Sequence, residues 1–300
     1  MDHISVCVCT YRRPEQLARL LETLTEQRRD DSYSFEIVVV DNDNRRSAEP
    51  VVKQFSAAAG VDVRYDCEPE QNIALTRNRA VRAAKGNLIA FIDDDETAEP
   101  QWLGELYRTL KGHEVQGALG PVVPDFPDDA PSWLKRARVY NRRRLPTGSR
   151  ISPEDARTGN VLLYRSNFVG DGDWFDPAFG LTGGEDSDFF QRRFERGCAF
   201  VWSDEAVAHE LVPPSRWSAS FHLKRYLRSG TLDGERIRSG LMNSDGLVLR
   251  SAVILGGCVA VSPVLLFVPK HLSMKVLLKL AYCCGIVAAY AGVSLLRNRE

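Results

Sequence analysis

Acidic residues gather directly after a short apolar segment in the first third of the chain. Residues 88–92 (LIAFI) carry no polar side chain, and they are followed without a break by Asp93, Asp94, Asp95 and Glu96. Four successive carboxylates repel one another unless a cation or hydrogen-bond donors compensate their charge. Mg²⁺ or Mn²⁺ would do so and would keep coordination positions for phosphate oxygens. The alternative is an acidic turn that caps the following helix, and the spacing favours neither interpretation.

A second acidic group lies in residues 183–189 (GGEDSDF). The two glycines allow the backbone to approach a ligand closely. Glu185 and Asp186 are the catalytic candidates, and Asp186 is placed to deprotonate an acceptor hydroxyl as a general base. The alternative is that Asp186 only caps a helix, which is a position that Asp favours.

Alternating strand and helix patterns must position these acids. The short apolar segments 3–9, 35–40, 61–65 and 88–92 read as buried strands. Helices are expected from Pro14, over 49–59, and over 73–85 with Gly86 as the C-terminal cap. This alternation predicts an α/β fold with a mostly parallel sheet flanked by helices.

Polar groups follow three of the expected strands. They are Thr10, Tyr11 and Arg12; Asp41 and Asp43; and the acidic run that starts at Asp93. Ligands of open parallel sheets bind outside the carboxyl ends of the strands, so we expect these groups to meet at one edge. The chain has no GxGxxG or GxxxxGK[ST] segment, which argues against Rossmann-type and P-loop phosphate binding.

The middle of the chain contains a basic segment, residues 135–150. It carries seven Lys or Arg side chains and no acid, with aromatic and aliphatic residues interleaved. Such a segment suits an anionic membrane surface, and a solvated face is the alternative.

The last fifty residues contain two uncharged runs, 251–269 and 280–296, of 19 and 17 residues. The first is long enough for a helix of about 28 Å. We expect a hydrophobic helical hairpin that contacts a membrane, with a buried hairpin in a soluble core as the alternative. The topology stays open, because Lys270, Lys275 and Lys279 between the runs conflict with the positive-inside tendency.

Composition narrows the class of protein. Lys and Arg total 39 and Asp and Glu total 40, which argues against a nucleic-acid-coating protein. The seven cysteines form no CxxC pair, so neither a zinc module nor a disulfide framework is expected. No signal peptide is evident at the N-terminus. The expected division of the chain is 1–112, 113–240 and 247–300.

Four segments carry a family resemblance in their order and spacing. VCVCTYRRPEQL, VVVDNDN, FIDDDE and GGEDSDF resemble the family 2 glycosyltransferases, whose fold is GT-A, a Rossmann-like α/β fold. NIALTRNRAVRAAKGNLIAFIDDDE and TGNVLLYR are similar to bacterial exopolysaccharide glucosyltransferases of the succinoglycan and amylovoran type. The resemblance covers roughly residues 3–230, so it implies a nucleotide-sugar-binding half over 1–112, an acceptor-binding half over 113–240, and a membrane-associated tail outside it.

The resemblance implies site residues in two groups. The nucleotide-sugar would be bound by Thr10, Tyr11, Arg12, Asp41, Asp43, Arg77, Asp93 and Asp94, with Asp41 accepting a hydrogen bond from uracil. The Mg²⁺ or Mn²⁺ ion would be held by Asp95, with Asp93 and His209 as further ligands. Asp186 would be the base beside Glu185. The acceptor or its diphosphate would meet Arg216, Trp217, Arg225 and Arg228.

The implied activity is inverting transfer of one sugar, expected to be glucose, from a UDP-sugar to a polyprenyl-diphosphate-linked saccharide at the cytoplasmic face of the inner membrane. Transfer of a single sugar is expected because Pro213 stands where processive synthases of this family carry Gln in Gln-x-x-Arg-Trp. Two alternatives remain. A sugar-1-phosphate nucleotidyltransferase would release pyrophosphate, and a non-catalytic, membrane-anchored nucleotide-binding protein would use the aspartates as helix caps.

Overall fold

The chain folds into two compact units. The computed structural model describes residues 1–28, 31–58, 60–170, 174–240, 246–261, 268–293 and 295. The first unit comprises 1–125 with 142–211, and the second comprises 126–141 with 212–300. This division differs from the expected boundaries at 112 and 240, because strands from the middle of the chain complete the sheet that the first third begins.

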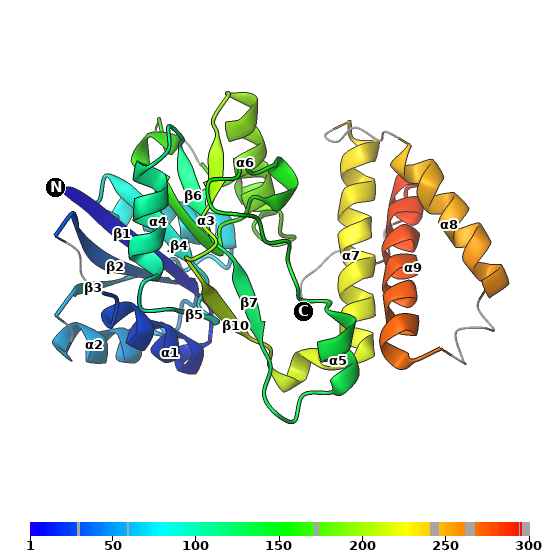
Figure 1. The fold of residues 1–300 in the computed structure, drawn as a ribbon, viewed down its shortest axis with the longest axis horizontal. Coiled ribbons are helices and arrows are strands. Elements are labelled where there is room, and N and C mark those ends of the chain that lie inside the picture. Colours follow the sequence, from blue (N-terminus) through cyan, green and yellow to red (C-terminus); the bar gives the residue numbers. More distant parts are fainter. Residues whose placement is uncertain are drawn as a thin grey trace. The chain divides into compact units, whose positions relative to one another are not determined.

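A seven-stranded sheet is the centre of the first unit (Figure 1). In spatial order its strands are β3 (Asp62–Cys67), β2 (Tyr33–Asp41), β1 (Asp2–Thr10), β4 (Leu88–Ile92), β8 (Asn160–Tyr164), β6 (Gly117–Leu119) and β9 (Phe200–Trp202). β8 runs antiparallel to both of its neighbours, and the other pairings are parallel. The predicted, mostly parallel sheet is confirmed.

Helices cover both faces of this sheet. α1 (Pro14–Thr25), α2 (Glu49–Ala58) and α4 (Trp102–Lys111) pack on one face, and α3 (Ile73–Ala83) and α6 (Glu185–Glu195) pack on the other. Within β1, Val6 and Val8 point into the first layer, while Cys7 points into the second. Both faces are therefore buried, which is why the strands read as continuous apolar runs.

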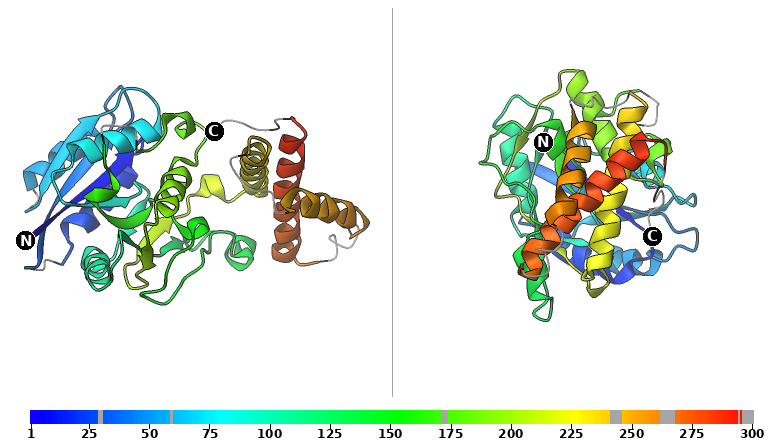
Figure 2. Two further views of the ribbon diagram at one scale, coloured as in Figure 1. Left: turned by 90° about the horizontal axis from the view of Figure 1, so that it is seen from above. Right: turned by 90° about the vertical axis from the view of Figure 1, so that its right-hand side faces the viewer.

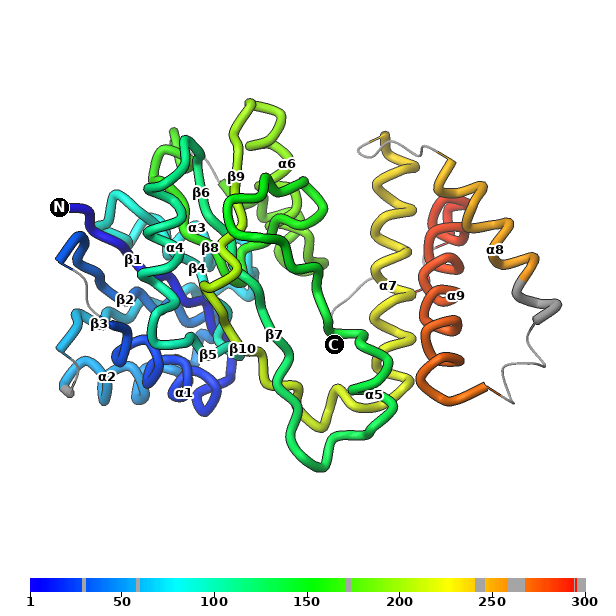
Figure 3. Tube along the Cα trace, viewed as in Figure 1, coloured from blue at the N-terminus to red at the C-terminus, as the bar shows by residue number. Residues whose placement is uncertain are grey.

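A second sheet has three strands, in the order β5 (Glu96–Ala98), β10 (Ala208–Leu211) and β7 (Val122–Asp125). The Cα trace shows β7 and β10 running side by side (Figure 3). Short 3-10 turns occupy Pro153–Asp155, Arg165–Asn167, Pro177–Phe179 and Pro214–Arg216. Because β5 starts at Glu96, the last residue of the acidic run, this small sheet fixes the direction in which the chain leaves the end of β4.

The second unit is helical, with α5 (Ser132–Ala137), α7 (Ala219–Arg238), α8 (Leu247–Val261) and α9 (Lys270–Tyr290). α9 packs against α7 and α8 (Figure 2). A Cβ atom at Gly230 would clash with the carbonyl of Tyr282, and one at Gly285 would clash with that of Leu227. Glycine therefore allows the backbones of α7 and α9 to approach closely.

α9 is long and apolar enough to cross a membrane, judged by length and composition. Its most apolar window has a mean hydropathy of 1.7, and 33% of that window is buried. α8 is apolar and shorter. Parts of the two expected uncharged runs, 262–267, 294 and 296, lie outside the described residues. The topology of the expected hairpin in a membrane stays a prediction.

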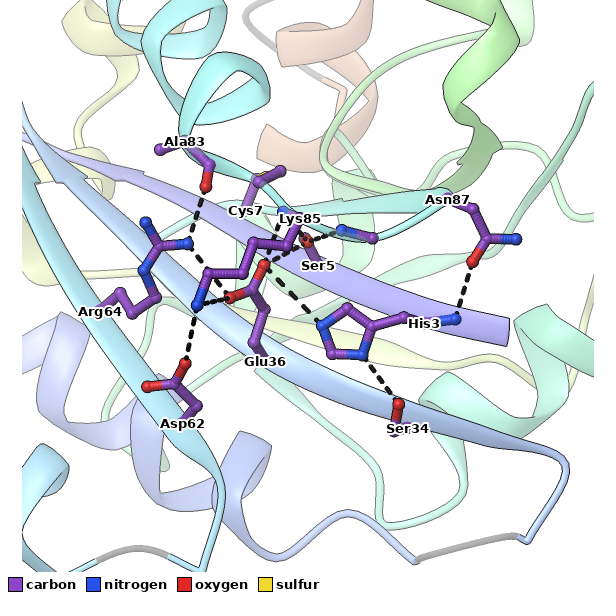
Figure 4. Close-up of polar contacts among 12 residues, drawn as sticks. His3, Ser5, Cys7, Ser34, Glu36, Asp62, Arg64, Ala83, Lys85 and Asn87 are labelled. Carbon is purple, nitrogen blue, oxygen red and sulfur yellow. Dashed lines mark hydrogen bonds and ion pairs between the residues drawn. The ribbon is translucent and has the colours of Figure 1, made fainter. Parts of the chain in front are cut away.

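A buried carboxylate joins β1, β2 and the end of α3 (Figure 4). Glu36 is 1% exposed, and it accepts hydrogen bonds from the Ser5 hydroxyl at 2.7 Å, the Lys85 amide at 2.7 Å and the Arg64 guanidinium at 3.2 Å. Burial raises the pKa of Glu36, but these donors outweigh it and lower the pKa overall. The Gly86 amide donates to the same Ser5 hydroxyl.

The expected cap at Gly86 is wrong. α3 ends at Ala83 with an extended Ala84 as its cap, and Gly86 does not have a positive φ. A Cβ at Gly86 would clash with the carbonyl of His3. Glycine is needed there for a close approach to β1, so that the turn can reach Ser5 and Glu36.

Glu36→Gln is expected to lower the free energy of unfolding by about 1–3 kcal/mol. One side-chain oxygen becomes an NH₂ group, which can no longer accept from Ser5 and Lys85, or from Arg64, depending on which oxygen is replaced. Urea denaturation of full-length protein measures this change. The control Glu105→Gln removes a carboxylate paired with Arg108 on the surface of α4, where a change within about 0.5 kcal/mol is expected. Equal stability of the two variants would show that the Glu36 cluster contributes no net stabilisation.

Candidate active site

Three segments converge on the acidic run after β4. The Thr10 hydroxyl donates to Asp94 at 2.8 Å. Arg13, just before α1, donates to Asp94 at 2.8 Å and to Asp95 at 3.1 Å. The ends of β1 and β4 and the start of α1 therefore meet at one edge, as expected for the carboxyl ends of parallel strands. Arg13 was not among the site residues predicted from the sequence, although its neighbour Arg12 was.

Arg12 turns to a different carboxylate. Its backbone is left-handed, with φ of 54°, and its guanidinium pairs with Asp43 at 3.4 Å. Asp41 is fully buried, and its oxygens accept from the amides of Asp43 at 3.0 Å and Ala48 at 2.8 Å. Asp41 thus holds the loop after β2 in shape, and the uracil contact implied by the resemblance stays a prediction. The Arg12 guanidinium lies over the Tyr11 ring, and its central carbon is 4.8 Å from the centroid of that ring.

Arg77 connects the acidic edge to the second acidic segment. It lies on α3 with its side chain 9% exposed, pairs with Glu185 at the start of α6, and approaches Asp93 to 3.5 Å. Burial disfavours its charge, but Glu185, Asp93 and Asp186 more than compensate and raise the pKa of Arg77. Glu185 is 2% exposed, and its second oxygen has no hydrogen-bond partner among the described residues.

The chain before α6 is tied to α3 by asparagines. Asn78 donates to the carbonyl of Phe175 at 2.8 Å and accepts from its amide at 3.0 Å. Asn72 caps α3 and donates to the carbonyl of Pro177 at 3.0 Å. These bonds and the Arg77 pair set the start of α6. There Asp186 is half-buried and accepts from the Ser187 amide at 2.7 Å.

Three carboxyl groups at this edge have raised pKa values. Burial raises the pKa of Asp93 to about 6, Arg77 opposes the increase, and Asp95 and Asp94 add to it. Burial likewise raises the pKa of Asp94 and, by more, that of Glu96. The charge of a hard divalent cation would offset the repulsion between these carboxylates.

The expected ligand set is only partly brought together. Asp95 and His209 line one cavity of about 210 Å³ with Gln16, Arg19, Glu96, Thr97, Asp125 and Leu211. His209 lies 3.1 Å from Glu99, which it contacts through Nε2. In the parts of the chain that the structure describes, no three His, Cys, Asp or Glu side chains form a group that could hold a metal ion. Asp93, Asp95 and His209 are therefore not a preassembled site, because Asp93 faces Arg77 and His209 faces Glu99.

The expected acceptor residues belong to the second unit. Trp217 donates to the carbonyl of Val212 at 2.9 Å, and Arg225 lies over the ring of Tyr140 at 5.7 Å. Arg216 ends a 3-10 turn, its carbonyl accepts from Tyr140 at 3.4 Å, and Arg228 lies on α7. Their part in binding an acceptor stays a prediction.

The basic segment 135–150 is divided between the two units. Lys135, Arg136 and Arg138 belong to the second unit. In the first unit, Arg142 pairs with Glu210 at 3.4 Å, Arg143 with Asp155 at 3.3 Å, and Arg144 with Asp204 at 2.8 Å. The sequence did not reveal these partners, because they lie 12 to 68 residues away.

Known proteins share sequence and fold with this chain. The model of the family described as Glycosyl transferase family 2 matches residues 5–167. The chain is 31% identical over 294 residues to the succinoglycan biosynthesis protein ExoM of Rhizobium meliloti, covering 97% of this chain and 94% of that protein.

Two solved structures of TarS 1-349 from S. aureus share the fold. The complex with UDP has a TM-score of 0.53 at 18% identity, covering 97% of this chain and 92% of that one. The complex with UDP-GlcNAc has a TM-score of 0.55 at 15% identity, covering 99% and 93%.

Proposed function

The chain belongs to glycosyl transferase family 2, and on that premise we propose that it transfers one sugar from a UDP-sugar to a polyprenyl-diphosphate-linked saccharide during exopolysaccharide synthesis. The observation that carries this proposal is the Arg77 bridge, which sets Asp93 at the donor edge against Glu185, the neighbour of Asp186. Similarity to ExoM supports the exopolysaccharide product, and the UDP and UDP-GlcNAc complexes of TarS support the donor class.

In the proposed mechanism, the nucleotide lies at the ends of β1, β2 and β4. Asp186 accepts the proton of the acceptor hydroxyl as that oxygen attacks the anomeric carbon and the bond to UDP breaks. One displacement with one base inverts the anomeric centre. A Mg²⁺ or Mn²⁺ ion held by Asp95, with Asp93 beside it, would neutralise the charge that develops on the departing diphosphate.

The apolar helix α9 supports contact with a membrane. The proposal places this contact at the cytoplasmic face of the inner membrane, where a lipid-linked acceptor would be found. Incubation of the full chain with a panel of radiolabelled UDP-sugars and a bacterial lipid extract tests the proposal. We expect label from one UDP-sugar, UDP-glucose first among the candidates, to enter the lipid fraction in a 1:1 ratio to acceptor. Release of pyrophosphate instead of UDP would favour a nucleotidyltransferase.

Asp95→Asn is expected to lower transfer by about 10²-fold or more and to remove the effect of Mn²⁺ on UDP affinity, because a neutral amide is a poor ligand for a hard cation. Calorimetric titration with UDP, in Mn²⁺ and in EDTA, measures this directly. Asp204→Asn is the control, since Asp204 is likewise paired with an arginine. Wild-type transfer that persists undiminished in excess EDTA would rule out the ion.

A further inference from the structure

Arg157 has no ion-pair partner among the described residues. Its guanidinium donates at 3.3 Å to the carbonyl oxygen of Asp155, and no carboxylate of the described residues lies within 4.0 Å of it. Asp186, Asp155 and Glu96 attract it from farther away. Burial first, and the charge of Arg142 second, lower the pKa of Arg157. A confined guanidinium in this state carries an uncompensated positive charge.

The surroundings of Arg157 add positive charge. It lines a small cavity together with Arg142, Arg143 and Asp155. Arg142 and Arg143 are each paired with one carboxylate, Glu210 and Asp155 respectively. Arg157 is therefore the member of this arginine group whose charge stays available to a ligand.

The next two residues point to the same ligand. Thr158 is 1% exposed, and its hydroxyl has no hydrogen-bond partner among the described residues. A Cβ atom at Gly159 would lie 3.0 Å from the Glu96 carboxylate and 3.1 Å from that of Asp93. Gly159 thus lies against the acidic edge, and in the part of the chain that the structure describes the two residues before it carry a guanidinium without an ion pair and a buried hydroxyl without a hydrogen bond.

We propose that Arg157 and Thr158 form an oxyanion subsite that binds a phosphate group of the diphosphate in the reaction. The fork of a guanidinium matches two phosphate oxygens, and a hydroxyl supplies a third donor. The phosphate belongs either to UDP or to the lipid diphosphate of the acceptor, since both offer this chemistry. This inference rests on the proposed function. The binding of pyrophosphate, however, can be measured whether or not the protein transfers a sugar.

Inorganic pyrophosphate is the probe, titrated calorimetrically into full-length protein in EDTA, so that protein groups alone hold it. Arg157→Gln is expected to weaken binding roughly 10- to 100-fold, and Thr158→Val roughly 2- to 10-fold. Arg144→Gln, which removes a guanidinium already paired with Asp204, should bind as the wild type does. Equal affinity of Arg157→Gln and wild type, or no binding by the wild type in the millimolar range, would overturn the subsite.

The source of the phosphate follows from two further measurements on Arg157→Gln. A weaker UDP affinity with an unchanged KM for the lipid acceptor assigns the subsite to the leaving diphosphate. An unchanged UDP affinity with a raised acceptor KM assigns it to the acceptor. If both stay at the wild-type values, the subsite is wrong. If wild-type protein transfers no sugar, the pyrophosphate titration still decides, so the two proposals can fail separately.

Discussion

Asp186→Asn is expected to lower kcat by about 10² to 10⁴-fold while UDP affinity stays near the wild-type value. The amide keeps the size of the side chain but cannot take the proton of the acceptor hydroxyl. Glu185 cannot replace it, because its carboxylate is buried against Arg77. Asp186 is half-buried, and its hydrogen bonds within the described residues go to its neighbour Ser187, so the fold should tolerate the change.

Single-turnover transfer, together with a UDP titration, separates the chemical step from binding in Asp186→Asn. Asp188→Asn is the matched control. It lies on the same turn of α6, and its carboxylate is paired with Arg192 at 2.7 Å. We expect its kcat to stay close to that of the wild type. A normal kcat in Asp186→Asn would place the base elsewhere in the protein.

Arg77→Met should lower the free energy of unfolding by about 3–5 kcal/mol, because it leaves the buried Glu185 carboxylate without its counter-charge. Glu185 is 2% exposed, and one of its oxygens already lacks a partner in the described structure. The variant should also lose transfer activity, because the start of α6 is no longer held against Asp93. Urea denaturation measures the stability, and the transfer assay measures the activity.

A double variant keeps this prediction testable if Arg77→Met folds poorly. Arg77→Met with Glu185→Leu removes both charges, so it should regain much of the stability and none of the activity. Arg79→Met is the control on α3, because Arg79 pairs with the partly exposed Asp66, and pairs near the surface contribute about 0–1 kcal/mol. If Arg77→Met is as stable as Arg79→Met, the buried pair of Arg77 and Glu185 adds no net stability.

Local patterns explain how much of the first unit could be predicted. The strands at 3–9, 35–40, 61–65 and 88–92 were found within two residues of their observed ends, because strands in a sheet covered on both faces consist mostly of apolar residues. The position of polar groups at the strand ends then placed Thr10 beside Asp94. Periodicity did not show that β8 inserts antiparallel between β4 and β6, since strand order depends on pairings between distant segments.

What the sequence determined by itself is the family, the α/β alternation and the acidic edge, because these depend on residue types at short spacing. Only the tertiary structure decided which charges meet. It paired Arg13 with Asp94 and Asp95, and Arg77 with Glu185, and it left Arg157 without a carboxylate partner in the described part of the chain. The physical reason is that an ion pair depends on separation in space and on burial. Residues 13 and 94, or 77 and 185, come together only when the sheet has formed.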